Sequence, residues 1–413
     1  MNIGVVVDND LIDDKRVLRE IYILRETGYE VFVLCFGFTN KTYTSVEEVS
    51  ITRISISKKL KNILFFFLNF IPVYEYIWAS SIKKFIKANN LQVLHVHDLY
   101  MAKAGWNGIN NSGRTIPMIL DLHENYPYAV TTYNWTKGRL RPLFSQPLKW
   151  QKKEREYLGF ADRIIVLSDD FRDTLTERYP ELPKALFTAL PNVPNLAQAE
   201  HKIAVKPVVN FESKGPVLFY FGVVAERRGI FDALSVFEEL VSENHPLVFL
   251  IIGPVDKKDS RRFFNIINSE QLHDRVNYIP WIDGSELPAY LEITDICLAP
   301  FQKNPQHESG VANKIYDYMF GKKPVIASDC KPQKKLIEKY RCGLIYTTRS
   351  EFKAAIEKLS SDTELRSEMG KNGFNAIVNE NHMGLIKGRL INLYKTISTS
   401  QVTGIGSEGE VPG

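Results

Sequence analysis

The sequence has few cysteines, and they show no pairing pattern. Four are spread over 413 residues, at Cys35, Cys297, Cys330 and Cys342, and none belongs to a C-x-x-C unit. Zinc ribbons and disulfide frameworks both need closely spaced cysteines, so this distribution argues against either. We expect buried thiols in a reducing compartment.

The sequence also lacks an uninterrupted apolar run of about 20 residues, which a membrane-spanning helix requires. Its most apolar stretch, residues 63–82, is broken by Asn69, Pro72 and Glu75. The N-terminal MNIGVVVDND leads directly into a predicted strand, without the basic flank and long apolar core of a signal peptide. We therefore expect a cytoplasmic protein.

A strong charge of one sign is absent too. The formal net charge is only +4, whereas nucleic-acid binding calls for a concentrated basic face. With 44% hydrophobic and 24% charged residues, the composition is that of a folded globular protein. The length predicts two or three domains.

Short apolar runs alternate with helical stretches in both halves of the chain. Examples are NIGVVV, VLHVH and MILDLH in the first half, and VLFYFG, LVFLIIG and PVIAS in the second. Such alternation is typical of a parallel sheet covered by helices on both faces. We predict an α/β fold of two doubly wound, Rossmann-like domains that face a cleft.

A segment rich in Pro, Asn and Ala between the halves marks the predicted linker. The predicted organisation is a first domain over 1–195, the linker over 196–215, a second domain over 216–380, a C-terminal helix over 381–397 that packs back on the first domain, and a disordered or added tail over 398–413.

Two stretches of the second half place cations where a helix is predicted to begin. In ESGVANKIYDYM, Lys314 falls in the first turn and Asp317 one turn later; after VLFYFG, Arg227 and Arg228 precede a helix from Ile230. Cations oppose the helix dipole there, so a bound anion would account for both. A diphosphate suits the cations, and a carboxylate suits ribose hydroxyls. A surface ion pair and a solvated arginine pair remain the alternatives.

Polar side chains also follow two predicted strands of the first half: His95, His97 and Asp98 in VLHVHDLYM, and Asp121, His123 and Glu124 in MILDLHENYP. A metal site is one option, but no H-x-x-x-H or comparable spacing supports it, and we expect no metal. A histidine beside carboxylates can bind hydroxyls or move a proton, which makes His123 a candidate. His95 lies inside its strand and is expected to be a core residue.

Basic and aromatic residues alternate over 132–160, and lysines flank the apolar stretch 63–82. Nucleic acid, an anionic membrane surface and ordinary packed helices can each use such a pattern. We expect no nucleic-acid partner. The prediction is that residues 58–84 and 135–157 meet an anionic membrane, at its inner face, unless they are packed helices.

These motifs resemble those of GT-B glycosyltransferases of family four, retaining and nucleotide-sugar-dependent enzymes typical of bacterial surface-polysaccharide assembly. DDKRVLREIYILRETGYEV, HVHDL and LDLHENYP are similar to the family's first-domain signatures. FYFGVVAERRG resembles the turn that contacts donor phosphates, and ANKIYDYMFGKKPVIASD resembles the family's most specific stretch. The resemblance runs to about Ile397. It implies that the first domain binds the acceptor and the second binds the donor.

The resemblance also implies residue roles. Arg228 and Lys314 would neutralise the donor diphosphate and, with His123 beside the transferred sugar, form the catalytic set. The implied donor-binding residues are Gly222, Arg227, Arg228, Ile282, Glu308, Ser309, Gly310, Val311, Ala312, Asn313, Lys314 and Asp317. The implied acceptor-side residues are Asp14, Arg16, His97, Asp121 and Glu124. Ser309 stands at the place of the family's first glutamate, with Glu308 one residue earlier, and Asp317 replaces the second.

The sequence thus predicts a glycosyltransferase that moves a sugar from a nucleoside-diphosphate-sugar to a saccharide or lipid-linked acceptor with retention, in cell-surface polysaccharide or glycan assembly. No cofactor is expected, because the nucleotide-sugar is a substrate. A nucleotide-sugar epimerase or hydrolase on the same fold is one alternative, and it would need a deep carboxylate, for which Glu308 is the candidate. A non-catalytic sugar- or nucleic-acid-binding module is the other.

Overall fold

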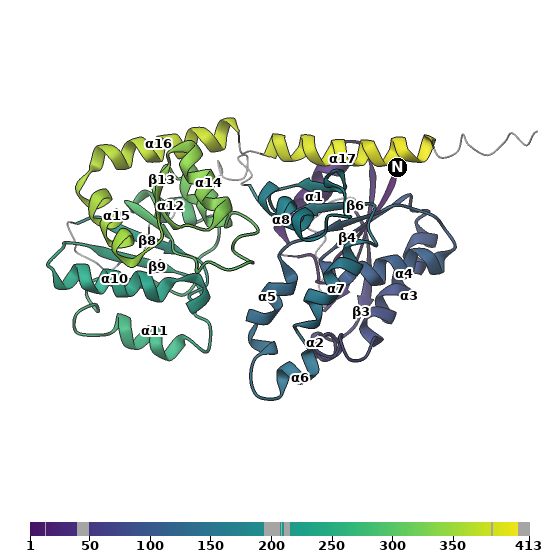
Figure 1. Ribbon diagram of the computed structural model, residues 1–413, viewed down its shortest axis with the longest axis horizontal. Helices are drawn as coiled ribbons and strands as arrows, with labels where there is room; N and C mark the ends of the chain where they lie inside the picture. The colour runs from purple at the N-terminus through teal and green to yellow at the C-terminus, as the bar shows by residue number, and fades with distance from the viewer. Residues whose placement is uncertain are drawn as a thin grey trace, which may run out of the picture. The chain divides into compact units, whose positions relative to one another are not determined.

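The computed structural model describes residues 1–12, 14–38, 49–193, 207, 209, 215–380 and 383–403. The chain divides into two compact units: unit 1 comprises Met1–Pro191 and Ile386–Gly413, and unit 2 comprises Asn192–Leu385. Each unit contains one parallel sheet with helices on both faces (Figure 1). The predicted linker, 196–215, lies outside the described residues except at positions 207, 209 and 215.

The sheet of unit 1 has seven parallel strands in the order β3-β2-β1-β4-β5-β6-β7. Its strands are β1 (Asn2–Val6), β2 (Glu30–Gly37), β3 (Ser50–Ser55), β4 (Val93–His97), β5 (Met118–Asp121), β6 (Arg163–Val166) and β7 (Phe187–Ala189). Its helices are α1 (Lys15–Glu26), α2 (Lys58–Phe66), α3 (Val73–Ala88), α4 (Ala102–Ser112), α5 (Tyr126–Thr132), α6 (Arg141–Ser145), α7 (Lys149–Leu158), α8 (Asp169–Arg178) and most of α17 (Met383–Thr403), with 3-10 turns η1 (Leu99–Met101), η2 (Asn134–Thr136) and η3 (Lys184–Leu186).

The sheet of unit 2 has six parallel strands in the order β10-β9-β8-β11-β12-β13. Its strands are β8 (Val217–Phe221), β9 (Val248–Ile252), β10 (Val276–Ile279), β11 (Ile296–Ala299), β12 (Val325–Ser328) and β13 (Gly343–Tyr346). Its helices are α10 (Ile230–Ser242), α11 (Ser260–Ile267), α12 (Leu287–Glu292), α13 (Asn313–Phe320), α14 (Lys331–Tyr340), α15 (Arg349–Ser361) and α16 (Thr363–Asn379), with the 3-10 turn η4 (Glu226–Arg228).

The two orders confirm the predicted pair of doubly wound, Rossmann-like domains. In each sheet the order reverses beside the first strand, between β1 and β4 and between β8 and β11. Ligands of such sheets bind beyond the carboxyl ends of the strands, at this point of reversal. A ligand site in each unit is therefore expected at the residues that follow these strands.

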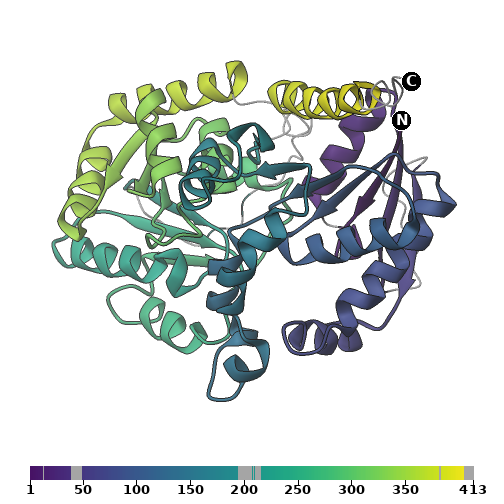
Figure 2. The same ribbon diagram turned by 45° about the vertical axis from the view of Figure 1, so that its right-hand side comes forward.

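Helices cover both faces of each sheet. In unit 1, α3 and α4 pack together on one face, and α1 and α17 lie on the other (Figures 1 and 2). In unit 2, α10 and α15 pack on one face, and α13, α14 and α16 on the other. Strands covered in this way bury side chains on both faces, so β4 and β9 are buried along their whole lengths.

Parts of the two basic, aromatic stretches belong to the core of unit 1. Helix α3 buries Tyr74, Trp78 and Ile82, and α7 buries Trp150 and Tyr157. For these side chains, the packed-helix reading of 58–84 and 135–157 is the right one. Helix α2 has no fully buried residue.

The C-terminal helix continues beyond its predicted end at residue 397. Helix α17 reaches Thr403, because residues 398–403 contain neither Gly nor Pro and Gly404 follows them. Residues 398–403 are thus helical, and the rest of the predicted tail, 404–413, lies outside the described residues.

Candidate functional site

In unit 2 the turn after β8 packs tightly against the end of β11. Gly229 follows η4 with a positive φ of 73°, and a Cβ atom there would lie 1.5 Å from the carbonyl oxygen of Pro300. Only glycine permits both that conformation and that approach. The approach holds Arg228 beside Phe301, with the guanidinium carbon 5.3 Å from the ring centroid.

Lys314, in the first turn of α13, points toward the end of β8. Its Nζ lies 3.6 Å from the ring centroid of Tyr220 and 5.1 Å from that of Phe301. Gly222 also faces it, since a Cβ on Gly222 would lie 3.2 Å from Nζ. The Nζ is buried and has no hydrogen-bond partner among the residues that the structure describes.

The electrostatics around Lys314 are unfavourable for its charge. Burial lowers its pKa well below the ordinary value, Arg228 lowers it further, and Asp317 acts in the opposite direction. An ammonium that is buried beside a guanidinium and lacks a hydrogen-bond partner is stabilised by an anion. The predicted residues Gly222, Arg228, Lys314 and Asp317 therefore do lie close together, at the corner between the end of β8 and the start of α13.

Other predicted donor residues have different partners. The guanidinium of Arg227 forms an ion pair of 2.8 Å with Asp256, whereas Arg228 and Lys314 both lie near the ring of Phe301. Glu308 Oε1 accepts a hydrogen bond of 2.9 Å from the backbone N–H of Lys331, at the start of α14. The Ser309 hydroxyl is buried and donates to the carbonyl oxygen of Pro305.

The remaining predicted donor residues are placed by the loop that precedes α13 and by the segment after β10. Gly310 and Val311 precede the N-cap residue Ala312, and Asn313 is the first residue of the helix. Ile282 is buried, and no contact described brings it to Lys314. Sequence reasoning missed His307, whose ring lies 4.9 Å from that of Phe301.

The pKa of His307 is affected by the same cations. Burial lowers its pKa to about 4, and the nearby Arg228, Arg227 and Lys314 contribute in the same direction. Its Nδ1 lies 2.6 Å from the carbonyl oxygen of Gln302. Its position after β11 was a signal in the sequence, but no spacing pattern distinguished it from other loop residues.

In unit 1 the register of two neighbouring strands brings the predicted polar residues together. His97 ends β4 and pairs with Asp121, which ends β5. Arg16, from the first turn of α1, donates two hydrogen bonds of 2.8 Å to the Asp121 carboxylate and a third to the carbonyl oxygen of Leu190. This paired geometry is the strong form of the arginine–carboxylate interaction.

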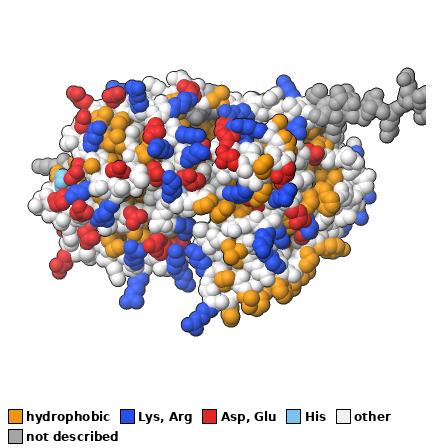
Figure 3. Space-filling model, viewed as in Figure 1, with side chains coloured by type: hydrophobic (Ala, Val, Ile, Leu, Met, Phe, Trp, Pro, Cys, Tyr) orange, Lys and Arg blue, Asp and Glu red, His pale blue; other side chains and the backbone are white. Residues whose placement is uncertain are grey.

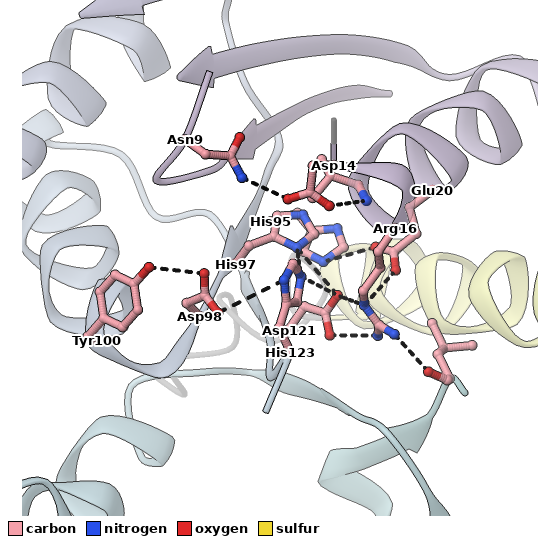
Figure 4. Close-up of polar contacts among 12 residues, drawn as sticks. Asn9, Asp14, Arg16, Glu20, His95, His97, Asp98, Tyr100, Asp121 and His123 are labelled. Carbon is pink, nitrogen blue, oxygen red and sulfur yellow. Dashed lines mark hydrogen bonds and ion pairs between the residues drawn. The ribbon is translucent and has the colours of Figure 1, made fainter. Parts of the chain in front are cut away.

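His123 lies between this network and Asp98, which in turn contacts Tyr100 (Figure 4). Its Nε2 is 2.8 Å from Nδ1 of His97 and 3.4 Å from the Asp121 carboxylate, and its Nδ1 is 3.9 Å from Asp98. Its side chain is 20% exposed, whereas those of His97 and Asp121 are fully buried. Of these three residues, His123 is therefore the one that a ligand can reach.

Two carboxylates hold a proton on His123. Burial alone would lower its pKa, but Asp98 and Asp121 raise it to about 9. Burial would likewise raise the pKa of Asp121, yet Arg16 and His123 hold it well below the ordinary value. At neutral pH His123 is thus an imidazolium that can donate hydrogen bonds but cannot accept a proton.

The predicted acceptor-side residues divide into two groups. Arg16, His97 and Asp121 are buried behind His123 and act by holding it in place. Asp14 caps α1 by accepting from the backbone N–H of Val17, and the Glu124 carboxylate accepts a hydrogen bond from the Tyr133 hydroxyl. The last two therefore have structural partners.

Asp98 directly follows β4 and was named from the sequence as a polar residue at this strand end, but no role was predicted for it. It has a positive φ of 73° and accepts a hydrogen bond from the Tyr100 hydroxyl. A non-glycine residue held in that region of backbone conformation stores strain, which is common at functional sites.

One buried cluster has the residue types of a metal site. Possible ligand atoms of Glu20, His95, His97 and Asp121 all lie within 4.8 Å of one another. However, the guanidinium of Arg16 already contacts both carboxylates, at 2.8 Å for Asp121 and 3.3 Å for Glu20. A divalent cation there would be repelled by this charge, so we interpret the cluster as an arginine-centred polar network.

His95 is a core residue, as the sequence predicts. It is fully buried, and its Nδ1 lies 2.8 Å from the hydroxyl of Tyr394 on α17. Burial lowers its pKa well below the ordinary value, so it is neutral. The network thus joins β4 to the C-terminal helix.

Comparison with known proteins agrees with this geometry. The family profile "Glycosyltransferase Family 4" matches residues 17–198, and "Glycosyl transferases group 1" matches residues 202–376. The chain belongs to the glycosyltransferases that these two profiles describe. A search of curated protein sequences finds no match.

Solved structures of glycosyltransferases share the fold at low sequence identity. Sucrose-phosphate synthase from Thermosynechococcus elongatus is 17% identical with a TM-score of 0.72, over 97% of this chain and 100% of its own. Anabaena HepE in complex with UDP-glucose is 11% identical with a TM-score of 0.69, over 96% and 100%. The lipopolysaccharide outer core galactosyltransferase WaaB is 11% identical with a TM-score of 0.64, over 95% and 99%.

Among the residues that the structure describes, no helix combines the length and the apolar character that crossing a bilayer requires.

Proposed function

We propose that this glycosyltransferase transfers a sugar from a nucleoside-diphosphate-sugar to a saccharide or lipid-linked acceptor, with retention of anomeric configuration. The observation that carries the proposal is the buried ammonium of Lys314, which lies beside Arg228; the Lys314 Nζ has no hydrogen-bond partner among the described residues. A diphosphate, with about two negative charges, would neutralise both cations without a metal. The complex of HepE with UDP-glucose supports a donor of this class.

In the proposed reaction, the bond between the anomeric carbon and the diphosphate oxygen breaks, and an acceptor oxygen bonds to the same face of that carbon. The acceptor proton passes to the departing diphosphate oxygen, so no protein nucleophile takes part. Lys314 and Arg228 would stabilise the charge that develops on the diphosphate. Asp317, one turn along α13, would accept hydrogen bonds from the ribose hydroxyls.

The protonated state of His123 agrees with transfer of the acceptor proton to the diphosphate oxygen and not to a protein base. A general base must be unprotonated at the working pH, and His123, with a pKa of about 9, is not. Its role would be to donate a hydrogen bond to a substrate oxygen from the acceptor-binding unit. We also propose a place in cell-surface polysaccharide or glycan assembly, which the similarity to WaaB supports.

The epimerase or hydrolase alternative has less support. It needs a carboxylate available to the donor, and its candidate, Glu308, accepts a hydrogen bond at the start of α14 instead. Incubation with donor alone distinguishes the two, because a transferase forms product only when acceptor is also present.

The decisive test is thermal unfolding with UDP, GDP, CDP and dTDP, each in EDTA, for the wild type and Lys314→Met. One nucleoside diphosphate should stabilise the wild type, by about 2.7 kcal/mol at a hundredfold excess over Kd. Lys314→Met should lose this stabilisation. Without ligand it should be more stable than the wild type by about 1–3 kcal/mol, because a buried group without partners is removed.

Lys339→Met is the matched control, since that ammonium is exposed and paired with Glu380. It should change neither the nucleotide effect nor the stability by more than about 0.5 kcal/mol. If no nucleoside diphosphate stabilises the wild type, or if Lys314→Met is stabilised equally well, the donor assignment is wrong.

A further inference from the structure

Unit 1 exposes hydrophobic side chains in an unusually concentrated way. Of the 17 large hydrophobic side chains that are exposed among the described residues, nine lie in residues 58–73 and 134–153. They include Phe70, Ile71 and Val73 from the first segment and Leu140, Leu143 and Leu148 from the second. Single exposed hydrophobics are normal, but a cluster of this kind indicates a binding surface.

The two segments form one surface, which we call the apolar tip. The Asn69 side chain donates hydrogen bonds of 3.0 Å and 3.2 Å to the carbonyl oxygens of Ser145 and Gln146. The ring of Phe67 lies 6.0 Å from that of Phe144. Figure 3 shows hydrophobic side chains gathered at this edge of the unit, where Figure 1 places α2 and α6, with Lys and Arg beside them.

The charge of the tip has one sign. Residues 58–73 and 134–153 contain nine Lys and Arg and no Asp or Glu, whereas the whole chain has a net charge of only +4. Exposed apolar side chains beside a purely basic set fit the interface of an anionic bilayer, where the former enter the acyl boundary and the latter meet the headgroups. We infer that the apolar tip docks the protein on an anionic membrane surface.

Other occupants fit less well. A second copy of the chain would bring two equally basic tips together, and the like charges would repel. Nucleic acid would use exposed aromatic faces for stacking, but most of the exposed side chains here are aliphatic, and Trp150 and Tyr157 are buried.

The tip is attached to the candidate site of the same unit. The ring of Phe65 in α2 lies 5.0 Å from that of Tyr100, whose hydroxyl donates to Asp98. Lys61 forms an ion pair of 3.2 Å with Asp8, beyond the end of β1. The tip therefore lies next to the carboxyl ends of the strands that hold His123, which suits an acceptor presented by a membrane.

Co-sedimentation with vesicles tests the inference. The wild type should bind vesicles of phosphatidylcholine with phosphatidylglycerol, bind phosphatidylcholine alone far more weakly, and be released by salt. Lys59→Gln with Arg139→Gln and Lys149→Gln should weaken binding about a hundredfold, because each basic side chain near an anionic surface contributes about fivefold. Phe70→Asn with Leu143→Asn and Leu148→Asn should also abolish sedimentation.

Matched controls separate the tip from net charge and from general hydrophobicity. Lys83→Gln with Lys84→Gln and Lys87→Gln removes the same charge from exposed positions of α3 that lie about 15 Å or more along the helix from Val73. Val378→Asn with Leu385→Asn removes exposed apolar side chains elsewhere. Both controls should bind vesicles like the wild type.

Three results would overturn the inference: equal binding to both vesicle types, tip variants that bind like the wild type, or control variants that lose binding equally. If the wild type does not bind vesicles but self-associates or binds oligonucleotides, and tip variants lose that activity, the surface belongs to those partners instead. The docking does not depend on the proposed reaction. A tip variant that loses vesicle binding should still be stabilised by the nucleoside diphosphate, so failure of one proposal is distinguishable from failure of the other.

Discussion

At the scale of single residues, the two candidate sites differ in whether a cationic side chain has counter-ions from the protein. Burial and Arg228 lower the pKa of Lys314, and no hydrogen-bond partner compensates it among the described residues. Burial would also lower the pKa of His123, but Asp98 and Asp121 raise it to about 9. Lys314 is thus prepared for an anionic ligand, whereas His123 already has its counter-ions and keeps its proton.

This account of His123 predicts the effect of Asp98→Asn. Removing one of the two carboxylates should lower the His123 pKa by about 1 to 3 pH units, which an NMR titration of the imidazole measures. His123 stabilises the fold fully below its ordinary pKa of 6.5, and this contribution is lost as the pH rises through about 9. In Asp98→Asn the His123 pKa is lower, so the contribution of His123 to the free energy of unfolding should be lost at a lower pH than in the wild type.

Asp274→Asn is the control for this titration, because Asp274 pairs with the exposed His273 of unit 2. It should leave the His123 pKa unchanged. A His123 pKa that stays near 9 in Asp98→Asn would show that Asp98 is not the carboxylate that matters.

At the scale of elements, the position of Arg228 near Lys314 depends on how closely the turn after β8 approaches the end of β11. Gly229→Ala would place a Cβ atom 1.5 Å from the carbonyl oxygen of Pro300, at a φ of 73°. We expect a loss of more than about 3 kcal/mol, because backbone must move, and loss of stabilisation by nucleoside diphosphate. Thermal unfolding with and without the nucleotide measures both.

Gly113→Ala separates the clash from the conformational penalty. Gly113 ends α4 with nearly the same φ, 72°, but a Cβ there would meet nothing within 4 Å. It should cost only about 1–2 kcal/mol and leave nucleotide stabilisation intact. Equal losses for the two variants would mean that the contact with Pro300 is unimportant.

The elements also show what the sequence could and could not predict. The alternation of apolar runs with helical stretches predicted VLHVH as a strand, which is β4 over its full extent, and strand-end reasoning predicted the region of Lys314. The partners of those residues depend on long-range packing, which no local pattern encodes. That is why Arg227 turned out to pair with Asp256, and why His307 and the three-residue strand β7 were missed.

At the scale of the whole molecule, unit 1 is completed by a segment that follows unit 2 in the sequence. Residues from Ile386 onward belong to unit 1. Lys387 pairs with Glu26, Arg389 donates to the carbonyl oxygen of Ala189, and Tyr394 contacts His95. The last element of the chain therefore supports the network behind His123, although it follows unit 2 in sequence.

Two leucines on α17 make this arrangement testable. Leu390 is fully buried and Leu385 is 46% exposed, only five residues apart. Leu390→Ala should cost about 2–5 kcal/mol, and Leu385→Ala less than about 0.5 kcal/mol. Hydrogen exchange locates the loss: in Leu390→Ala it should rise in β1, β4 and α1 rather than in β8 to β13. Faster exchange mainly in unit 2 would mean that α17 stabilises the unit it follows and not the one that carries His123.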